Sequence, residues 1–379
     1  MTENSSMKEG FLCVANWDSN VGYAWWLMES FWVKIASEYS TTYNVYVAYP
    51  SISKLPESIA SSTLFCELCD FGPRNFFGVL SQIRFILKNK IKIIYFSDKR
   101  FSDWRYALYR VFGVRKIIVH DHTPGLRTKP VGVKRIYKTI RSWVPFMNCD
   151  LMIGATEFVR QRCIDVYRFP ERKCFSAPNG IPVKTHKKKT LDISLPSNRC
   201  IIATVGRASE YKGIYFALSV INKLVVNYGC KNILYLWVGD GPEFESVKRR
   251  VSDLGLKDYF WMPGRVEGVE GLLDACDIGF HPSKGEVGYS LSILESMLSS
   301  LPVVVPDNPS VSEAISHGGN GFVYERQNVD DACKYLYLLI SNEGLRKKLG
   351  AQARQDVSNK YSINTTHTVL IEIMDNAIK

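Results

Sequence analysis

Short, continuously apolar segments recur along the chain and constrain its fold most strongly. Helical segments separate several of them, the first spanning about residues 23–36. Strands that are apolar throughout, rather than at every second residue, suit parallel sheets that are buried on both faces. The pattern therefore predicts an α/β fold built from βαβ units. In the first half the predicted strands are FLCVANW (11–17), YNVYVAYP (43–50), IKIIYFS (91–97), RKIIVHDH (115–122) and CDLMIGAT (149–156).

A second series of the same kind begins at residue 199. Between the two series, residues 178–198 contain three prolines and a basic cluster but no sustained apolar period, which predicts a linker. We expect an N-terminal domain (1–177), a C-terminal domain (199–355) and a C-terminal helical segment (356–379). The second series alternates strands at 199–207, 232–239, 259–264, 277–283 and 301–307 with helices at 213–229, 242–255, 271–276 and 290–300.

The length of 379 residues and the 46% of hydrophobic residues suit two packed domains. No stretch reaches the ~18–20 consecutive apolar residues that a membrane-spanning helix needs. The polar N-terminal residues lack the pattern of a secretory signal. A cytoplasmic protein is the expectation. Cys66 and Cys69 form a C-x-x-C pair without further nearby zinc ligands, so we expect reduced thiols, with a redox pair as the alternative.

Positive charge is concentrated in the first half. The net charge is +11, and residues 71–147 alone hold 17 basic and 3 acidic residues. A field of one sign attracts anionic partners, such as nucleic acid, an anionic membrane surface or phosphorylated small molecules. For any single lysine, a solvated basic surface is the simpler interpretation.

Two cations follow the first strand of the second series. VGRASEYKG (205–213) places Arg207 and Lys212 in the loop between that strand and the next helix. Ligands of open α/β sheets bind at the carboxyl ends of the strands. Cations beside a helix N-terminus there suit a diphosphate. In HPSKGEVGYSLSILE (281–295), Gly288 allows close backbone approach, and the amides of residues 289–291 open a helix that also carries Glu295.

These motifs together resemble a known family. Residues 203–323 are similar to the C-terminal domain of family 4 of the retaining glycosyltransferases, which have the GT-B architecture. The matching pieces are VGR…KG (205–213), VGDGPE (238–243), MPGRV (262–266), VGYSLSILE (287–295) and PVVVPD (302–307), while PNGIP (178–182) resembles the end of the family's N-terminal domain.

The resemblance implies two Rossmann-like domains that face each other across a cleft, with a C-terminal helix that returns to the N-terminal domain. It implies that Arg207 and Lys212 neutralise the donor diphosphate and that Glu295 accepts hydrogen bonds from the ribose. Backbone near Gly264 and Arg265 would read the base. Phosphate and sugar would be contacted by Gly288, Tyr289, Ser290 and Leu291.

One glutamate of the family pattern is displaced. Counted back from Glu295, it falls on Val287, and Glu286 stands one residue earlier. Either the loop carries an extra residue and Glu286 positions the donor sugar, or the role is unfilled. We favour Glu286. Glu295 by itself would also fit a surface glutamate.

The N-terminal half contributes two further candidates by resemblance. Gly22 lies where the family has a glycine loop facing the donor phosphates, although a plain turn glycine explains it equally well. In VHDHTPG (119–125), His122 is expected to hydrogen-bond the transferred sugar, with His120 and Asp121 as alternatives.

Residues 126–146 combine cations with aromatic side chains. The cations recur at partly helical spacing, and aromatic side chains stand among and after them. The cations are Lys134, Arg135, Lys138 and Arg141, and the aromatic residues are Tyr137, Trp143 and Phe146. This pattern fits an interfacial helix on anionic lipid or a site for a lipid-diphosphate acceptor, and a solvated basic helix fits equally well. Nucleic acid is not expected, because no standard binding motif is present.

The expected activity is transfer of a sugar from a UDP- or GDP-linked donor to a glycan or lipid-linked acceptor, with retention of configuration. No metal and no cofactor are expected, because cations and amides can stabilise the departing diphosphate. Polysaccharide biosynthesis at the cytoplasmic side of a membrane is the common context of the family. A nucleotide-sugar epimerase and a non-catalytic nucleotide-binding subunit are the competing hypotheses.

Overall fold

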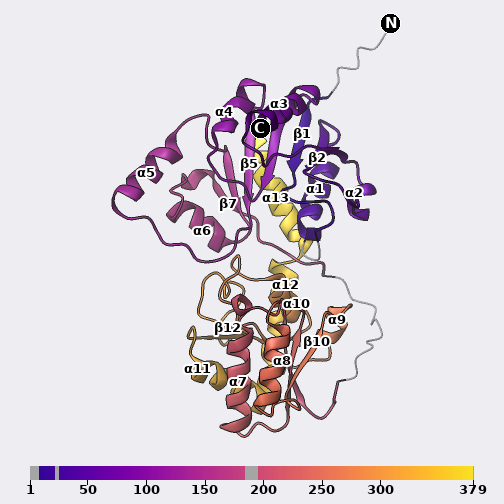
Figure 1. The fold of residues 1–379 in the computed structure, drawn as a ribbon, viewed down its shortest axis with the longest axis vertical. Helices are drawn as coiled ribbons and strands as arrows, with labels where there is room; N and C mark the ends of the chain where they lie inside the picture. Colours follow the sequence, from indigo (N-terminus) through magenta and orange to yellow (C-terminus); the bar gives the residue numbers. More distant parts are fainter. Residues whose placement is uncertain (1–7, 22–24, 184–194, 379) are drawn as a thin grey trace. The chain divides into compact units, whose positions relative to one another are not determined.

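The computed structural model describes residues 8–21, 25–183 and 195–378. The chain divides into two compact units. Unit 1 comprises residues up to Thr123, Arg127–Pro178 and the residues from His367 onward. Unit 2 comprises Pro124–Leu126 and Asn179–Thr366. Each unit is an open sheet with helices packed against it (Figure 1).

Unit 1 is built on a seven-stranded parallel sheet with the strand order β3-β2-β1-β4-β5-β6-β7. The central strands β1, β4 and β5 are almost completely buried, which explains their continuously apolar sequences. The strands are β1 (Gly10–Val14), β2 (Asn44–Tyr49), β3 (Phe65–Leu68), β4 (Ile91–Ser97), β5 (Lys116–Asp121), β6 (Leu151–Gly154) and β7 (Cys174–Ser176).

The helices of unit 1 connect these strands, and most of them bury one apolar face. α1 buries Phe31, Trp32 and Ile35, and α3 buries Val79 and Ile86. The helices are α1 (Trp26–Tyr39), α2 (Glu57–Ala60), α3 (Phe76–Lys88), α4 (Trp104–Val111), α5 (Gly132–Trp143) and α6 (Glu157–Asp165), with a 3₁₀ turn η2 at Glu171–Lys173.

Unit 2 has a six-stranded parallel sheet with the order β10-β9-β8-β11-β12-β13. β9 is buried at every residue and α7 buries seven side chains, so the core lies between them. The strands are β8 (Cys200–Val205), β9 (Ile233–Val238), β10 (Phe260–Gly264), β11 (Ile278–Phe280), β12 (Val303–Pro306) and β13 (Gly321–Tyr324). The helices are η3 (Glu210–Lys212), α7 (Ile214–Val226), α8 (Phe244–Asp253), α9 (Val269–Leu273), α10 (Leu291–Leu298), α11 (Val329–Ser341) and α12 (Glu343–Lys360).

The last helix, α13 (Ile363–Ile378), belongs to both units. Its first residues lie in unit 2, and from His367 onward it packs in unit 1. There Leu370 and Met374 are fully buried, and the Tyr39 hydroxyl donates a hydrogen bond to Asp375 Oδ1 at 2.6 Å. The expected return of the C-terminal helix to the N-terminal domain is confirmed.

The predicted α/β fold with two Rossmann-like sheets is confirmed, and three short strands escaped prediction. β3, β7 and β13 have only three or four residues, and β3 is partly exposed.

Within the predicted linker, Asn179–Val183 form part of unit 2, where the Ile181 amide donates to Tyr361 O at 2.9 Å. Residues 184–194 lie outside the described residues.

Candidate active site

The sheet of unit 2 has a topological switch point between β8 and β11. The chain proceeds from β8 to β9 and β10 on one side, and from β11 to β12 and β13 on the other. The connections that follow the two adjacent strands therefore run to opposite sides of the sheet, and ligands of such sheets bind at the carboxyl edge at this point. The loop after β8 carries Arg207 and Lys212, and the loop after β11 carries Glu286 and Gly288.

Glycines allow these loops to approach each other closely. Gly213 has φ 82°, and a Cβ atom there would lie 2.1 Å from Pro282 O in the loop after β11. A Cβ on Gly239, which follows β9, would lie 2.2 Å from Gly206 O. Gly213 of the VGR…KG motif and Gly239 of the VGDG motif are thus required by contacts between loops. Gly264 continues the arrangement, because its carbonyl accepts from the Gly239 amide at 2.8 Å.

A buried charge cluster joins the two loops at the switch point. Lys212 Nζ lies 2.5 Å from Glu286 Oε1, and His281 Nε2 lies 3.1 Å from the same oxygen. Glu286 is only 8% exposed. Its second oxygen, Oε2, has no hydrogen-bond partner among the described residues.

The cluster fixes the ionisation of Glu286. Burial alone would raise its pKa, but the hydrogen bond with His281 and the charge of Lys212 outweigh burial and lower the pKa to about 2. Glu286 is therefore a carboxylate at neutral pH. A group with so low a pKa is poorly suited to accept a proton in catalysis, and well suited to hold cations and hydroxyl groups in place.

Arg207 is exposed and forms no ion pair or hydrogen bond through its side chain within the described part of the chain. It lies on the loop that also carries Lys212, at the carboxyl end of β8. Arg265, directly after β10, is likewise exposed. Of the predicted cations, the structure thus leaves Arg207 and Arg265 open to solvent and engages Lys212 with a carboxylate.

The segment 288–295 forms the N-terminal end of α10. Gly288 has φ 116°, which favours glycine, and its amide donates to Ser310 O at 2.9 Å. Ser290 is the N-cap residue, and its hydroxyl accepts from the Ile293 amide. Leu291 and Glu295 are partly exposed one turn apart on one face of the helix. The side chain of Tyr289 is buried, and its hydroxyl donates to Asn179 O at 2.9 Å, so only its backbone remains for a ligand.

Three residues that the sequence analysis did not select support this loop. His281 follows β11 directly and contacts both Glu286 and Ser290 Oγ, the latter at 3.4 Å. Ser310 Oγ accepts from the Glu286 amide at 3.4 Å, and Asn308 Oδ1 accepts from the Ser310 hydroxyl at 2.9 Å. A histidine at the carboxyl end of a predicted strand was a signal that could have been used, whereas Ser310 and Asn308 carried none.

His122 lies at the end of β5 in unit 1. Its amide donates to Asp98 Oδ1 at 2.6 Å, and its ring stacks on Phe31 with the ring centroids 5.8 Å apart. The neighbouring His120 is fully buried and lies 2.5 Å from the Tyr95 hydroxyl. His120 thus fits the role of a core histidine, and Asp121 pairs with Arg162 at 3.2 Å. Gly22 lies outside the described residues.

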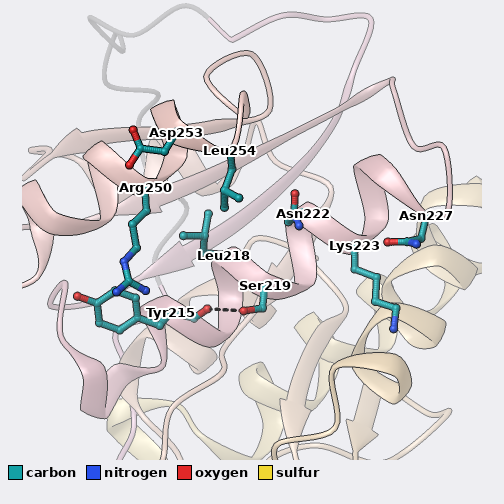
Figure 2. Close-up of a pocket in the computed structure, with 9 residues that line it drawn as sticks. All are labelled: Tyr215, Leu218, Ser219, Asn222, Lys223, Asn227, Arg250, Asp253 and Leu254. Atoms are coloured by element: carbon teal, nitrogen blue, oxygen red, sulfur yellow. Dashed lines mark hydrogen bonds between the residues drawn. The ribbon is translucent and has the colours of Figure 1, made fainter.

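A separate hollow of about 610 Å³ lies between α7 and α8 (Figure 2). Arg250 stands over the ring of Tyr215 at one end, at 4.9 Å from its centroid, and Lys223, which forms an ion pair with Asp330, lies at the other. It lies between helices and includes none of the predicted site residues.

No group of His, Cys, Asp and Glu side chains suited to a metal ion occurs among the described residues. The cysteines of the described chain, including Cys66 and Cys69, are free thiols, and burial raises the pKa of both. No helix in the described ranges is long and apolar enough to cross a membrane.

Comparison with protein families shows what the region around this site is similar to. The model of the family described as "Glycosyl transferases group 1" matches residues 187–356. This stretch, somewhat less than half of the chain, is similar to that family. The matched residues contain the whole charge cluster, Arg207 and the N-terminal end of α10.

Curated relatives match the chain in part. An uncharacterized glycosyltransferase of Haemophilus influenzae is 27% identical over 60% of this chain, but the match covers only 62% of that protein. The UDP-Gal:alpha-D-GlcNAc-diphosphoundecaprenol alpha-1,3-galactosyltransferase of Escherichia coli is 21% identical over 76% of each chain. The chain therefore spans less than two thirds of the first of these relatives.

Solved structures confirm the fold over almost the whole chain. A glycosyltransferase from Rickettsia africae has a TM-score of 0.79 at 18% identity and covers 98% of this chain and 99% of its own. Anabaena HepE in complex with UDP has a TM-score of 0.71 at 17% identity and covers 98% of this chain and 100% of its own. The GT-B fold class is therefore confirmed.

Proposed function

We propose that this chain is a glycosyltransferase that moves a sugar from a nucleotide-diphosphate sugar to an acceptor with retention of anomeric configuration. The observation that carries the proposal is the Lys212–Glu286–His281 cluster, whose Lys212 lies on a loop that also carries the exposed Arg207, at the switch point of a sheet that matches the glycosyl transferases group 1 family. A site with preorganised cations at the carboxyl ends of parallel strands suits the departure of a diphosphate.

In the proposed reaction the cations act on the leaving group. Arg207 and Lys212 neutralise the diphosphate as it gains charge, and the amides at the start of α10 contact its oxygens. The anomeric carbon becomes positively charged when its bond to the diphosphate breaks. The acceptor hydroxyl then attacks from the same face, and the departing phosphate takes its proton. Domain closure would exclude water and limit hydrolysis.

Glu286 has a positioning role in this scheme. Its oxygen Oε1 holds Lys212, and Oε2 is left to accept hydrogen bonds from hydroxyl groups of the donor sugar. Since its pKa is about 2, it does not serve as the proton acceptor. Glu295 is proposed to bind the ribose, residues 264–265 the base, and His122 the transferred sugar.

The donor and acceptor classes follow by analogy with relatives. UDP is the first nucleotide to test, because HepE was solved with UDP and the Escherichia coli relative is named for UDP-Gal. That relative's name also supports a lipid-diphosphate-linked acceptor. We propose that the reaction takes place in the cytoplasm, at the membrane that holds such an acceptor.

Thermal unfolding with UDP, GDP, ADP and CMP tests the donor site. A nucleotide at about 100 times its dissociation constant should stabilise the protein by roughly 2.7 kcal/mol. We expect one diphosphate to do so and Glu295→Ala to abolish the effect. Turnover that requires an acceptor would then support transfer, and turnover without one would identify an epimerase. Absence of stabilisation by every nucleotide would contradict the proposal and favour a non-catalytic role.

A further inference from the structure

Helix α5 of unit 1 has the reverse of the usual burial pattern. Its apolar residues recur at i, i+3, i+4 and i+7 and form one face, yet they are between 60% and 81% exposed. Its only buried residue is Ser142. Helices on globular domains normally bury the apolar face and expose the polar one. In Figure 1, α5 stands apart from the sheet and the other helices of unit 1. The exposed apolar residues are Val133, Ile136, Tyr137, Ile140 and Trp143.

The polar side of α5 holds it against the body of unit 1. Lys138 Nζ donates to Val166 O at 3.0 Å, and Arg141 Nη2 donates to Ser102 O at 3.2 Å. The Asn148 amide donates to the carbonyls of Arg141, Ser142 and Val144 at the end of the helix, at 2.9–3.0 Å. These contacts fix the rotation of the helix about its axis. The outward orientation of the apolar face is therefore determined by the fold of unit 1.

Positive charge surrounds the apolar face. The exposed side chains of Lys134 and Arg135 form no ion pair within the described residues, and the sequence contains no acidic residue between Asp121 and Asp150. A hollow of about 450 Å³ lies beside α5 and is lined by Arg74, Arg100 and Arg141 together with Tyr137 and Ile140. Its only carboxylate, Asp103, is already paired with Arg74 at 2.7 Å and with Arg105 at 2.9 Å.

We infer that α5 and the adjacent arginine-lined hollow form a docking surface for an anionic lipid bilayer, with the apolar face at the acyl boundary and a lipid phosphate in the hollow. An amphipathic helix with Trp, Tyr and Ile on one side and cations beside them suits the interface of an anionic membrane. The inference deepens the membrane location that forms part of the proposed function. It rests on unit 1 alone, however, and its test does not depend on sugar transfer.

Two other occupants fit the surface less well. A second copy packed through the same face would bring Lys134 and Arg135 of both copies together without a compensating carboxylate. Nucleic acid would leave the row of exposed aliphatic side chains without apolar contacts. Two of the four cations of α5 point back to the body of the unit instead of outward.

Co-sedimentation with vesicles tests the inference on the full chain. We expect binding to vesicles of equimolar phosphatidylcholine and phosphatidylglycerol at low salt, and weak binding to phosphatidylcholine alone. The double variant Ile140→Ser/Trp143→Ser should lower partitioning at least about tenfold. Val226→Ser, which removes an equally exposed side chain from α7 in unit 2, should leave it unchanged.

The charged positions give a second pair of variants. Lys134→Gln/Arg135→Gln should weaken binding by roughly fivefold for each cation removed. Lys347→Gln/Lys348→Gln, an exposed pair on α12, makes the same change in net charge and should have little effect. Arg100→Gln tests the hollow and should cause a smaller loss than the double charge variant. Thermal unfolding of each variant checks that the fold is retained, which the exposure of these side chains favours.

Three results would overturn the inference. The first is the absence of binding to anionic vesicles, and the second is equal binding by the Ile140→Ser/Trp143→Ser variant. The third is a concentration-dependent dimer that the same variant abolishes while vesicle binding persists, since the apolar face would then serve self-association. Failure of nucleotide binding would refute the proposed function but would leave this surface untouched.

Discussion

The two units share a strand order and differ in what they place at the same topological position. Counted within each unit, the first six strands follow the order 3-2-1-4-5-6. Asp98 follows the fourth strand of unit 1, and the loop after the fourth strand of unit 2 carries Glu286. Burial raises the pKa of Asp98, and the opposing effects of His122 are too small to reverse the shift. In unit 2, His281 and Lys212 overcome burial and lower the pKa of Glu286 to about 2.

The comparison shows that topology provides a location and that neighbouring side chains provide the chemistry. In unit 2 the carboxylate holds Lys212, the cation that we propose acts on a diphosphate. In unit 1 the carboxyl group lies among histidines and aromatic rings, and the positive charge lies elsewhere, around α5. Unit 2 is accordingly proposed to bind the nucleotide, while unit 1 is proposed to bind sugar, acceptor and membrane.

Gly213→Ala should produce the largest effect on unit 2. The substitution combines a Cβ atom 2.1 Å from Pro282 O with a positive φ, and we expect a loss of about 3 kcal/mol or more in the free energy of unfolding. Gly229→Ala is the matched control, since its φ is also positive but nothing lies within 4 Å of its Cβ, and about 1 kcal/mol is expected. Chemical denaturation measures both. Equal losses would show that the contact between the two loops is unimportant.

Glu286→Gln should have the next largest effect on the free energy of unfolding. It leaves Lys212 beside a neutral group and should destabilise the protein at pH 7 by on the order of 3 kcal/mol, the equivalent of the pKa shift from 4.5 to about 2. Because the folded-state pKa is lowered, this stabilisation is present above pH 4.5 and is lost as the pH falls towards 2. Unfolding of wild type and variant should therefore converge in acid. A constant difference would argue against the ion pair.

Arg207→Ala should weaken binding without affecting the fold. The side chain is exposed, so the free energy of unfolding should stay within about 0.5 kcal/mol of wild type. Loss of one charge-assisted contact to the diphosphate should raise the Kd for the preferred nucleotide by roughly tenfold. Isothermal titration of this variant beside Arg249→Ala, an exposed arginine on α8, separates a local contact from a change in net charge. Equal affinities would remove Arg207 from the proposed site.

Asp98→Asn should give the smallest effect and would sharpen the contrast with Glu286. Since burial raises the pKa of Asp98, its ionised form is disfavoured in the fold, and the associated stability is lost as the pH rises through that pKa. Asparagine keeps an acceptor for the His122 amide and tolerates the positive φ of 54°. We expect stability at pH 7 to be unchanged or higher by up to about 1 kcal/mol. Clear destabilisation in thermal unfolding would show that the charge of Asp98 is needed.

The sequence predicted those parts of the fold that depend on local pattern. Buried central strands such as β4 and β9 are continuously apolar, and the helical spacing of residues 134–141 led to α5. The edge strand β3 was missed because it is short, partly exposed and contains Glu67. The spacing also could not show that the apolar side of α5 faces outward, since that depends on hydrogen bonds to Val166 and Ser102.

The candidate site was predictable where a motif specifies a residue type. Arg207, Lys212 and Glu286 follow strands and were selected, and the structure brings Lys212 and Glu286 together. His281 was not selected, although it contacts the same Glu286 oxygen as Lys212 does. The reason for Gly213 could not be foreseen, because Pro282, its neighbour in space, lies about seventy residues away in the chain. Such contacts arise only from the packing of loops on a completed sheet.

The passage of α13 from unit 2 into unit 1 has a consequence for the order of folding. During synthesis every residue of unit 2 is available before His367 emerges, whereas the hydrophobic core of unit 1 still lacks Leu370 and Met374. The unit that starts first is thus completed last. A nascent chain that ends before α13 would hold a finished unit 2 attached to an unfinished unit 1 with apolar surface exposed, a state in which partly folded chains are prone to aggregate.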